Sequence, residues 1–367
     1  MMLLGMELNT DREGKKPIKK KKVSRCVLPV IAVILAVSLL FSLCSCSVET
    51  TRYLIGTVVN LKIEGNNSKK AEKAILSLIN DVEGSVSTAI DNSCISSINH
   101  AEVGEKVVLD DIADTLISYA YTYYSKLKEL FGYGVFDISV YPLVELWGFS
   151  PDKIDSENKT PPSDGDIDKT MELVGLDRAF LYDGKEKTLT KLIDGAKLDL
   201  GGLAKGYIAD EANKIFKKYG IKSGIADIGG NLYLYGDRTF RVGVKNPRKG
   251  ATDDYIKEII TVKNTSVVTS GDYERYYIDK NGRRYHHIID PRNGRPSDSG
   301  LISVTVVAKS SVVADILTTS IMILGKERGE LLLRSEDIET AIFMCEDGEA
   351  GVKVETYTKE SRASIAV

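Results

Sequence analysis

The chain has 367 residues, and its 49 lysines and arginines nearly balance its 52 aspartates and glutamates, which gives a formal net charge of −3. Residues 1–25 carry +5, residues 26–45 carry no charge, and the rest of the chain carries −8. This acidic balance after residue 45 argues against a nucleic-acid-binding protein, which needs basic side chains to neutralise phosphates. Hydrophobic residues make up 43% and charged residues 28%, which excludes a mainly disordered chain.

The first 45 residues have the layout of an export signal. A lysine-rich stretch precedes an uncharged run from Cys26 to Leu43. Leu43-Cys44-Ser45-Cys46 resembles a bacterial lipobox, so we predict cleavage before Cys46 and a lipid attached to Cys46. The alternative is an uncleaved transmembrane anchor, because 18 apolar residues nearly span a bilayer. Both place the remaining chain outside the cytoplasm, since the positive flank stays inside, and a lipid would hold it at the outer face of the cytoplasmic membrane.

The N-terminal half of this body shows two helical patterns. The 322 residues from Cys46 onward fit one large domain or two intimate subdomains. Residues 51–64 alternate apolar and polar side chains, which predicts a strand, and residues 69–86 and 109–131 have apolar residues at helical spacing. The second helix carries four tyrosines, for which packing is favoured over a ligand cage. Residues 153–168 are polar, contain two prolines and are predicted to form a loop.

The C-terminal half is mostly short strands. Residues 178–182 and 188–192 suggest a hairpin, and helices are predicted at 204–219 and 311–324. The remaining patterns predict strands at residues 225–228, 232–235, 240–244, 256–262, 273–278, 284–288, 301–308, 341–344 and 352–356. Strands and helices are mixed without regular alternation, which favours an α+β fold with mixed, largely antiparallel sheets and packed helices.

Two glycine-containing segments carry candidate site residues. In GVFDISVYPLVELWGF (residues 134–149), Asp137 lies among apolar residues, so it either has a binding partner or caps the following turn. In LDLGGLAKGYIAD (residues 198–210), a turn at Gly201-Gly202 is predicted to lead into a helix that carries Lys205. A helix start with nearby glycines and a lysine suits a phosphate group, although a plain tight turn is the alternative.

Two further segments supply acid–base and metal-ligand candidates. His286 and His287 are two of three histidines, and on a strand their side chains point to opposite faces, so at most one faces a given pocket. That one is an acid–base candidate, and a structural role is the alternative. In ADILTTS (residues 314–320), Asp315 and Thr319 are one helical turn apart. Carboxylate plus hydroxyl suits Mg²⁺ better than Zn²⁺, unless the threonine merely bonds to its own helix backbone.

Taken in order, these segments resemble the ApbE family, the FAD:protein FMN transferases. The resemblance runs from about Thr51 to Leu333. It includes the following motifs: IGT at 55–57, S-x-x-S-x-x-N at 93–99, VFD with PLV-x-LWGF, LDLGGLAKGYIAD, IADIGGNLYLYG, VTSGDYERYY, HHIIDPRNGRP and ADILTTS. It implies an ApbE-like, T-fold-like fold and Mg²⁺-dependent transfer of FMN from FAD to a threonine hydroxyl of a partner protein, with release of AMP.

The resemblance also assigns residues. Mg²⁺ would be held by Asp315, Thr319 and the backbone carbonyl of Gly202, and His287 would be catalytic. FAD would contact Ile55, Val135, Phe136, Asp137, Asp199, Lys205 and Ile289. Two positions depart from the family, which usually has methionine at Ile55 and often an aromatic residue near Ala89; the tyrosine cluster could supply the missing contacts.

The implied partner is a membrane-associated redox protein that carries an acceptor threonine. The family's acceptor motif ends in threonine, whereas residues 194–197 here read DGAK, so self-modification at this place is not expected. Two alternatives stay open from sequence: an Mg²⁺-dependent FAD pyrophosphatase that gives FMN and AMP, and a non-catalytic FAD-binding lipoprotein.

Overall fold

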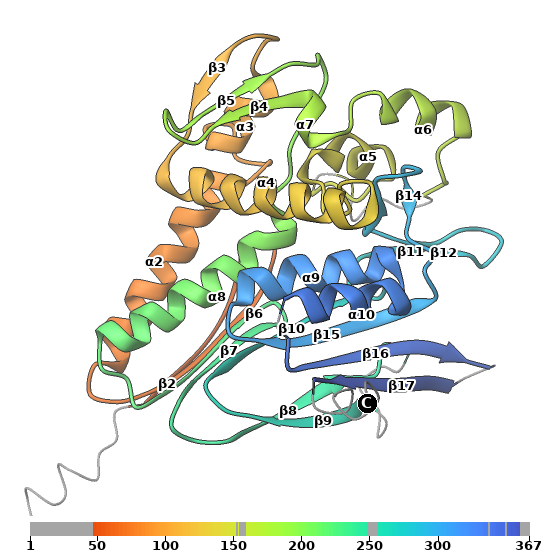
Figure 1. Cartoon of the computed structure of the whole chain (residues 1–367). Helices are drawn as coiled ribbons and strands as arrows, with labels where there is room; N and C mark the ends of the chain where they lie inside the picture. Colours follow the sequence, from red (N-terminus) through yellow and green to blue (C-terminus); the bar gives the residue numbers. More distant parts are fainter. Residues whose placement is uncertain are drawn as a thin grey trace, which may run out of the picture. The chain divides into compact units, whose positions relative to one another are not determined.

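An eight-stranded antiparallel sheet organises the structure, which is a computed structural model that describes residues 47–151, 153, 159–248, 255–336, 338–348 and 351–359. The export signal and Cys46 lie outside the described residues. The strand order is β1 (Ser47–Leu54), β2 (Thr57–Glu64), β6 (Ser223–Ile228), β7 (Asn231–Gly236), β10 (Thr265–Gly271), β15 (Leu301–Ala308), β16 (Thr340–Asp347) and β17 (Gly351–Thr358). Figure 1 shows this sheet below a layer of helices.

Both faces of the sheet are covered. Helices α2 (Ser68–Val86), α8 (Gly201–Lys218), α9 (Ser311–Leu324) and α10 (Lys326–Ser335) form the layer on one face (Figure 1). The ribbon of β8 (Phe240–Lys245) and β9 (Ile256–Val262) covers the other. Successive side chains of β10 point to opposite faces of the sheet: Val268 belongs to the main core under the helices, whereas Val267 packs with Phe240 of the β8–β9 ribbon.

A second group of elements lies beyond the helix layer. It contains α3 (Cys94–His100), α4 (Asp111–Phe131), and a small sheet of β3 (Lys106–Val108), β5 (Thr188–Lys191) and β4 (Phe180–Asp183). Asp110 caps α4 by accepting hydrogen bonds from two backbone N–H groups, and Gly132 ends it in the left-handed conformation. The hydroxyl of Tyr121 donates to the carbonyl of Phe180, and that of Tyr124 to Asp177, so the tyrosines pack as predicted.

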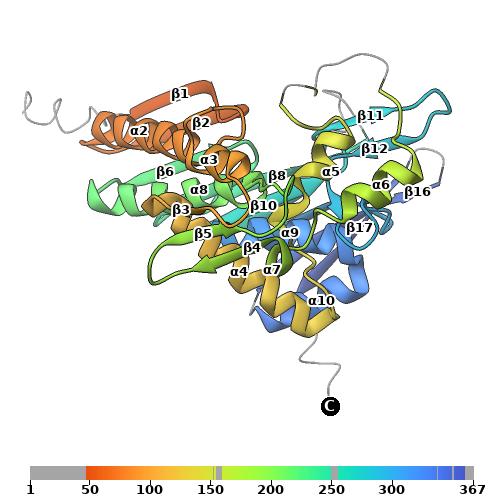
Figure 2. The ribbon, with the colours of Figure 1, turned by 90° about the horizontal axis from the view of Figure 1, so that it is seen from above.

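Short elements complete the edge of the molecule near the functional segments. They are η1 (Ile138–Val140), α5 (Tyr141–Leu146), α6 (Asp164–Met171), α7 (Leu176–Ala179) and the hairpins β11 (Tyr276–Ile278)–β12 (Arg284–His286) and β13 (Ile289–Asp290)–β14 (Arg295–Pro296). Figure 2 shows α5, α6, β11 and β12 together on the side opposite β1 and α2. Trp147, the only tryptophan, anchors a small apolar cluster here. Among the described helices, none has the length and apolar character needed to cross a membrane.

The α+β prediction is confirmed, but several boundaries were wrong. Residues 51–64 form the end of β1, a two-residue turn at Ile55-Gly56 and all of β2, because a tight turn inside an alternating apolar pattern leaves the pattern intact. The predicted loop at 153–168 ends in α6, which Ser163 caps. Helix α8 begins at Gly201, so both glycines belong to the helix and not to a preceding turn.

Candidate active site

Helices α8 and α9 cross at very close range at Gly206. A Cβ atom at this position would lie 2.6 Å from the carbonyl oxygen of Ser311 and 2.7 Å from the Cα of Val312, so the crossing requires glycine. The backbone N–H of Gly206 donates to Oδ2 of Asp315 at 3.0 Å, and Nζ of Lys205 lies 3.7 Å from its Oδ1. Lys205 and Gly206, which are adjacent on α8, therefore contact the two carboxylate oxygens of Asp315, one each.

Asp315 is a buried carboxylate in this crossing. Its residue is only 2% exposed, and burial raises the pKa of the side chain while the nearby Lys205 cation acts to lower it. A buried charge is costly unless cations or hydrogen bonds compensate it. The ammonium group of Lys205 at 3.7 Å, the Gly206 N–H and the side chain of Asn231 favour the charged form, and burial opposes it more strongly. A further cation would stabilise this carboxylate.

Thr319 differs from the hydroxyl residues beside it. Thr318 donates to the carbonyl of Asp315 at 3.1 Å, and Ser320 donates to that of Ile316 at 2.7 Å, so both bond back to their own helix. The hydroxyl of Thr319 makes no hydrogen bond to any described residue and is partly exposed. The backbone-bonding alternative thus holds for its neighbours, and Thr319 keeps a free oxygen one turn from Asp315.

The N-terminus of α8 has no side-chain cap. Leu200 occupies the cap position, and the N–H of Gly201 donates to Oδ1 of Asp199 at 2.9 Å. At Gly202 a Cβ atom would meet only the ring of Phe136, at 3.3 Å, among the described residues. The N–H groups of Leu203 and Ala204 donate to the carbonyl of Leu200, so in the first turn the N–H of Gly202 is the one without a partner among the described residues. This N–H, the positive dipole end and Lys205 one turn further along suit a phosphate group.

The block at residues 135–137 forms a wall beside this helix start. Val135 and Phe136 are buried in the main core. Oδ1 of Asp137 accepts from the N–H of Ser139 at 2.8 Å, and Oδ2 accepts from the N–H of Leu176 at 3.2 Å. Burial raises the pKa of Asp137 to about 6. Asp137 is therefore the cap of η1, as the capping alternative predicted, and its carboxylate is occupied by the chain's own donors.

The two neighbouring histidines have different environments. Nε2 of His286 lies 2.9 Å from the carbonyl oxygen of Ser297, and its Nδ1 lies 3.3 Å from the N–H of Ile288. Because a carbonyl only accepts, Nε2 carries the proton and Nδ1 accepts. Both ring nitrogens are used, and His286 is structural.

His287 leaves one ring nitrogen available. Its Nδ1 lies 3.2 Å from the carbonyl oxygen of Arg275, which also accepts the backbone N–H of His287 at 3.1 Å. Nδ1 therefore carries the proton, and Nε2 holds the lone pair. Burial, and then the positive charge of Arg275, lower the pKa of His287 to about 3, and Lys205 adds to the effect. His287 is thus a neutral base in the field of Lys205.

The tip of the β1–β2 hairpin reaches the segment that anchors His287. Ile55 and Gly56 both have positive φ angles, +48° and +67°, as a two-residue type I′ turn requires. This conformation is unusual for a β-branched residue. A Cβ atom at Gly56 would lie 3.7 Å from Nη2 of Arg275. By contrast, the side chain of Ile289 is buried in the Trp147 cluster, so only its backbone is placed to contact a ligand.

Two positioning residues, Asn99 and Asp210, end motifs that were recognised in the sequence without a role for either residue. Asn99 clamps the start of the glycine-containing segment: its Oδ1 accepts from the N–H of Leu198 at 2.7 Å, and its Nδ2 donates to the carbonyl of Leu198 at 2.9 Å. Asp210 caps α9 from α8 by accepting the N–H groups of Ser311 at 2.7 Å and Val312 at 3.1 Å. Asp210 could have been found from its spacing, because it lies one turn after Gly206 on the same face of α8.

The donor set fits a hard divalent cation. In the described part of the chain, no three His, Cys, Asp or Glu side chains come together as a possible metal site. Asp315 and Thr319 offer one carboxylate and one hydroxyl, and the carbonyl of Gly202 would add a third oxygen. Such a set suits Mg²⁺, which keeps water and phosphate oxygens among its ligands.

A separate cavity of about 570 Å³ lies beside β12, β14 and the end of α9. It is lined by His286, Trp147 and several arginines, and none of the predicted cofactor-binding, catalytic or metal residues lines it. Arg292 in this cavity pairs with Asp290, its neighbour in the same wall. The chemistry-bearing groups described above therefore lie outside this cavity.

Comparisons with known proteins agree with this arrangement. The sequence pattern of the ApbE family matches residues 55–343. A FAD:protein FMN transferase of Klebsiella pneumoniae is 32% identical over 293 residues, which cover 79% of this chain and 87% of the relative; that of Haemophilus influenzae is 29% identical and covers 82% and 88%. The crystal structure of an ApbE protein from Thermotoga maritima superposes with a TM-score of 0.75 at 29% identity, covering 87% of this chain and 99% of the other. The flavin transferase ApbE from Vibrio cholerae gives 0.72 at 28% identity, covering 85% and 97%. The chain therefore belongs to the ApbE family.

Proposed function

We propose that this chain is an FAD:protein FMN transferase that depends on Mg²⁺ and modifies a threonine hydroxyl. The observation that carries the proposal is the α8–α9 crossing, where a buried carboxylate, a lysine and an uncapped helix start come together beside a neutral histidine. Relatives that match over most of this chain are FAD:protein FMN transferases, which supports the same chemistry here.

The phosphate end of FAD would bind at the start of α8. The N–H of Gly202, the positive end of the helix dipole and the ammonium group of Lys205 would hold the pyrophosphate. Asp315, Thr319 and the carbonyl of Gly202 would hold Mg²⁺, which supplies charge neutralisation on the pyrophosphate and favours in-line displacement. Lys205 would then contact both the substrate and Asp315, so its position is fixed on both sides.

His287 would act as the general base. Its Nε2 takes the proton of the acceptor threonine hydroxyl, whose oxygen forms a bond to the FMN-side phosphorus while the bond from that phosphorus to AMP breaks. The proton later passes from Nε2 to solvent, and AMP leaves. The carbonyl of Arg275 holds Nδ1–H, so the ring keeps the tautomer that this step needs.

One experiment tests this reaction. The full chain is incubated with FAD, Mg²⁺ and an acceptor peptide, and AMP and covalently bound flavin are measured together. Transferase activity requires both products in equal amounts, and neither with the same peptide carrying alanine in place of threonine. AMP without covalent flavin would instead show a pyrophosphatase, and FAD that stays intact would show a carrier.

We also propose that the protein works at the outer face of the cytoplasmic membrane, anchored through a lipid on Cys46, and that its acceptor is a membrane-associated redox protein. The lysine-rich and apolar leader supports the export, and Leu43-Cys44-Ser45-Cys46 supports the lipid. Lys197 stands where the acceptor motif would have threonine and is paired with Glu145, which supports an external acceptor. Metabolic labelling with palmitate, lost in Cys46→Ala, tests the anchor.

A further inference from the structure

A group of exposed lysines surrounds the corner of the body where the described chain begins. We call it the lysine face. Its members are Lys69, Lys70, Lys73, Lys217, Lys218 and Lys222. None of these six makes an ion pair with any other described residue. The body as a whole is acidic, so this concentration of unpaired cations runs against its average charge.

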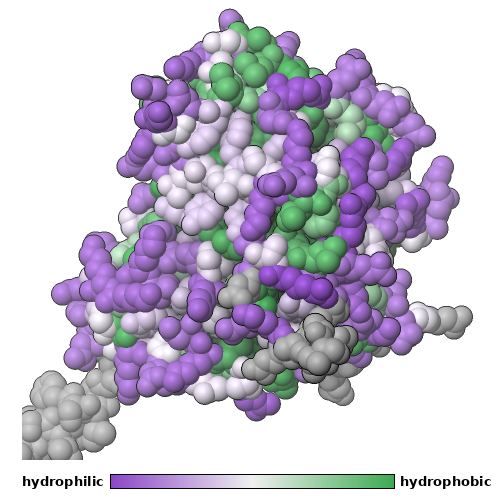
Figure 3. All heavy atoms as spheres, viewed as in Figure 1, coloured by the Kyte–Doolittle hydropathy of each residue, from purple (hydrophilic) through white to green (hydrophobic). Residues whose placement is uncertain are grey.

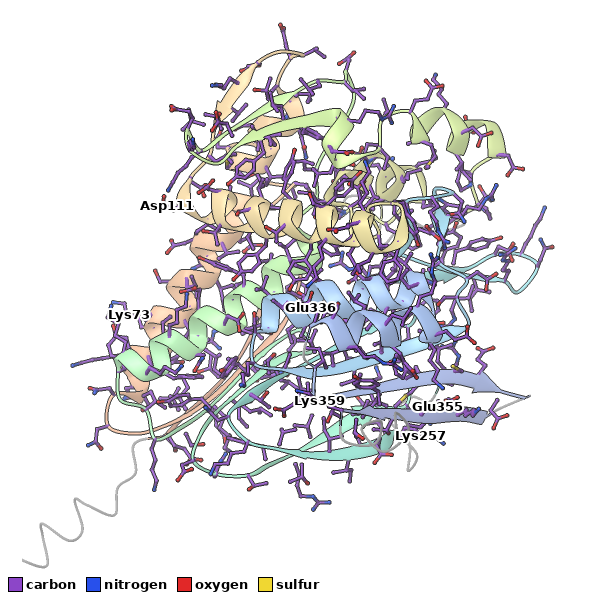
Figure 4. The ribbon with its side chains drawn as sticks, in the orientation of Figure 1. Lys73, Asp111, Lys257, Glu336, Glu355 and Lys359 are labelled. Atoms are coloured by element: carbon purple, nitrogen blue, oxygen red, sulfur yellow. The ribbon has the colours of Figure 1, made fainter. Side chains whose placement is uncertain are left out.

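Three contacts place these lysines at one corner. Asn67, just before α2, donates from Nδ2 to the carbonyl of Tyr219 at 3.0 Å, which holds the start of α2 against the end of α8. The N–H of Lys222 donates to the carbonyl of Glu64 at 2.9 Å, and Glu64 is the register partner of Ser47, the first described residue. Figure 4 labels Lys73 on α2 at this corner, and Figure 3 shows mainly hydrophilic side chains over it (lower left).

The acidic groups at this corner are already engaged. Glu64 pairs with Arg238 at 3.2 Å, and Glu72 accepts a hydrogen bond from Thr50. Asp237 pairs with Lys263. These contacts leave the six lysines without a carboxylate partner among the described residues, although Lys218 lies over the ring of Tyr219.

Helix stability does not explain the lysines of α2. Lys69 and Lys70 stand in its first turn, which contains no acidic residue, so their charges oppose the positive end of the helix dipole. Lys217 and Lys218, by contrast, lie in the last turn of α8, where their charges favour the helix dipole. The stability of α2 therefore gives no reason for Lys69 and Lys70.

We propose that the lysine face lies on the anionic headgroups of the bilayer and sets the orientation of the enzyme on the membrane. This inference rests on the lipid anchor proposed above: Ser47 follows directly on Cys46, so a lipid on Cys46 would bring this corner to the membrane surface. Each lysine near an anionic surface adds to the attraction, and the effect ends within a Debye length.

The length of β1 sets the distance between the lysine face and the candidate active site. The eight residues of β1 run from this corner to the Ile55-Gly56 turn, which lies against Arg275 and so against His287. At about 3.3 Å per residue, the seven steps from Ser47 to Leu54 span about 23 Å. With the lysine face on the headgroups, the site would stand at most about that far above them, within reach of partners that project from the same membrane.

The test uses the full chain in nanodiscs. One set contains phosphatidylcholine alone, and the other contains equal parts of phosphatidylcholine and phosphatidylglycerol. Acetylation of each lysine is followed by mass spectrometry. We expect about fivefold slower acetylation of the lysine face in the anionic discs, and no slowing at about 1 M salt. Lys106 and Lys185 on the small sheet serve as controls and should react equally in both sets.

A second readout reports the orientation itself. Trp147 is the only tryptophan, so energy transfer from it to a dansyl lipid measures how near its side of the body comes to the membrane. Transfer should be weaker in anionic discs than in neutral ones, and the difference should vanish when all six lysines are glutamine but persist in Lys106→Gln with Lys185→Gln. Equal acetylation in both discs, or slowing shared by Lys106 and Lys185, would overturn the proposal.

Discussion

The substitution Gly206→Ala tests whether the helix crossing builds the site. The added Cβ would meet backbone atoms of Ser311 and Val312 at 2.6 and 2.7 Å, and backbone cannot turn aside as a flexible side chain can. Restoring an ordinary contact of about 3.4 Å requires α9 to move away by about 0.8 Å. Overpacking of this kind costs up to about 3 kcal/mol, and the helix preference of alanine returns about 1 kcal/mol. We expect a net loss of about 2 kcal/mol.

The effect on activity should be larger than the effect on stability. Asp315 moves with α9, while Lys205 and the Gly206 N–H stay on α8, so the displacement separates the groups that would hold the cation and the pyrophosphate. A misplacement of about 1 Å at a reacting centre costs about 10²-fold in rate. The expected result is therefore a small fall in melting temperature, about 4 °C, together with a fall of about 10² in AMP release.

A matched control is Gly84→Ala in α2. Gly84 is also helical, but a Cβ atom there meets nothing within 4 Å. Alanine should stabilise this helix by up to about 1 kcal/mol and leave AMP release unchanged. The two glycine variants should thus move the unfolding free energy in opposite directions. If Gly206→Ala were as stable and as active as the wild type, the close crossing would not be what positions the site.

Three further substitutions probe single groups. His287→Ala should lower flavin transfer by about 10²- to 10⁴-fold and spare FAD binding, measured by flavin fluorescence. Because the pKa of His287 is lowered to about 3, its ring should stay neutral from pH 8 to 5. A rate loss with a midpoint near 6.5 that vanishes in the variant would contradict this lowered pKa. Asp315→Asn should abolish Mg²⁺-dependent AMP release yet unfold no more easily, since it removes a buried charge; full activity with EDTA present would refute the metal role. Asn99→Ala leaves the N–H and carbonyl of Leu198 unpaired, so the free energy of unfolding in urea should fall by about 1 to 3 kcal/mol, and an unchanged midpoint would refute the clamp.

Long periodic elements were predictable from the sequence, and short ones were not. The helix at residues 311–324 matches α9 because it combines a Ser310 cap with an apolar run, and both signals are local. The central strand β10 was missed, because its neighbours β7 and β15 are far away in the chain and TSVVTSG has weak alternation. Whether such a segment forms a strand depends on its pairing with distant segments, and a short stretch of sequence does not show that pairing.

In the candidate site, too, local spacing was predictable from the sequence and contacts between distant segments were not. Spacing alone placed Asp315 and Thr319 on one side of a helix, as the structure has them. It did not show that Asp137 is a cap, because the donors of Ser139 and Leu176 converge on it only in the folded chain. Nor could it separate His286 from His287, whose different partners, Ser297 and Arg275, are both set by neighbouring hairpins.

The packing of α8 against α9 explains why the site residues on both helices are spaced four residues apart. Gly202, Gly206 and Asp210 follow one another at four-residue steps on α8, and Ser311, Asp315 and Thr319 do so on α9. Asp210 caps Ser311, and Gly206 donates to Asp315, so the two helices run antiparallel with one contact per turn. The next step brings Gly202 opposite Thr319. No described atom of α9 lies within 4 Å of a Cβ at Gly202, and the hydroxyl of Thr319 has no described partner. The first two contacts hold the helices together, and at the third step no contact forms between them, which is where we propose that the cation and the pyrophosphate bind.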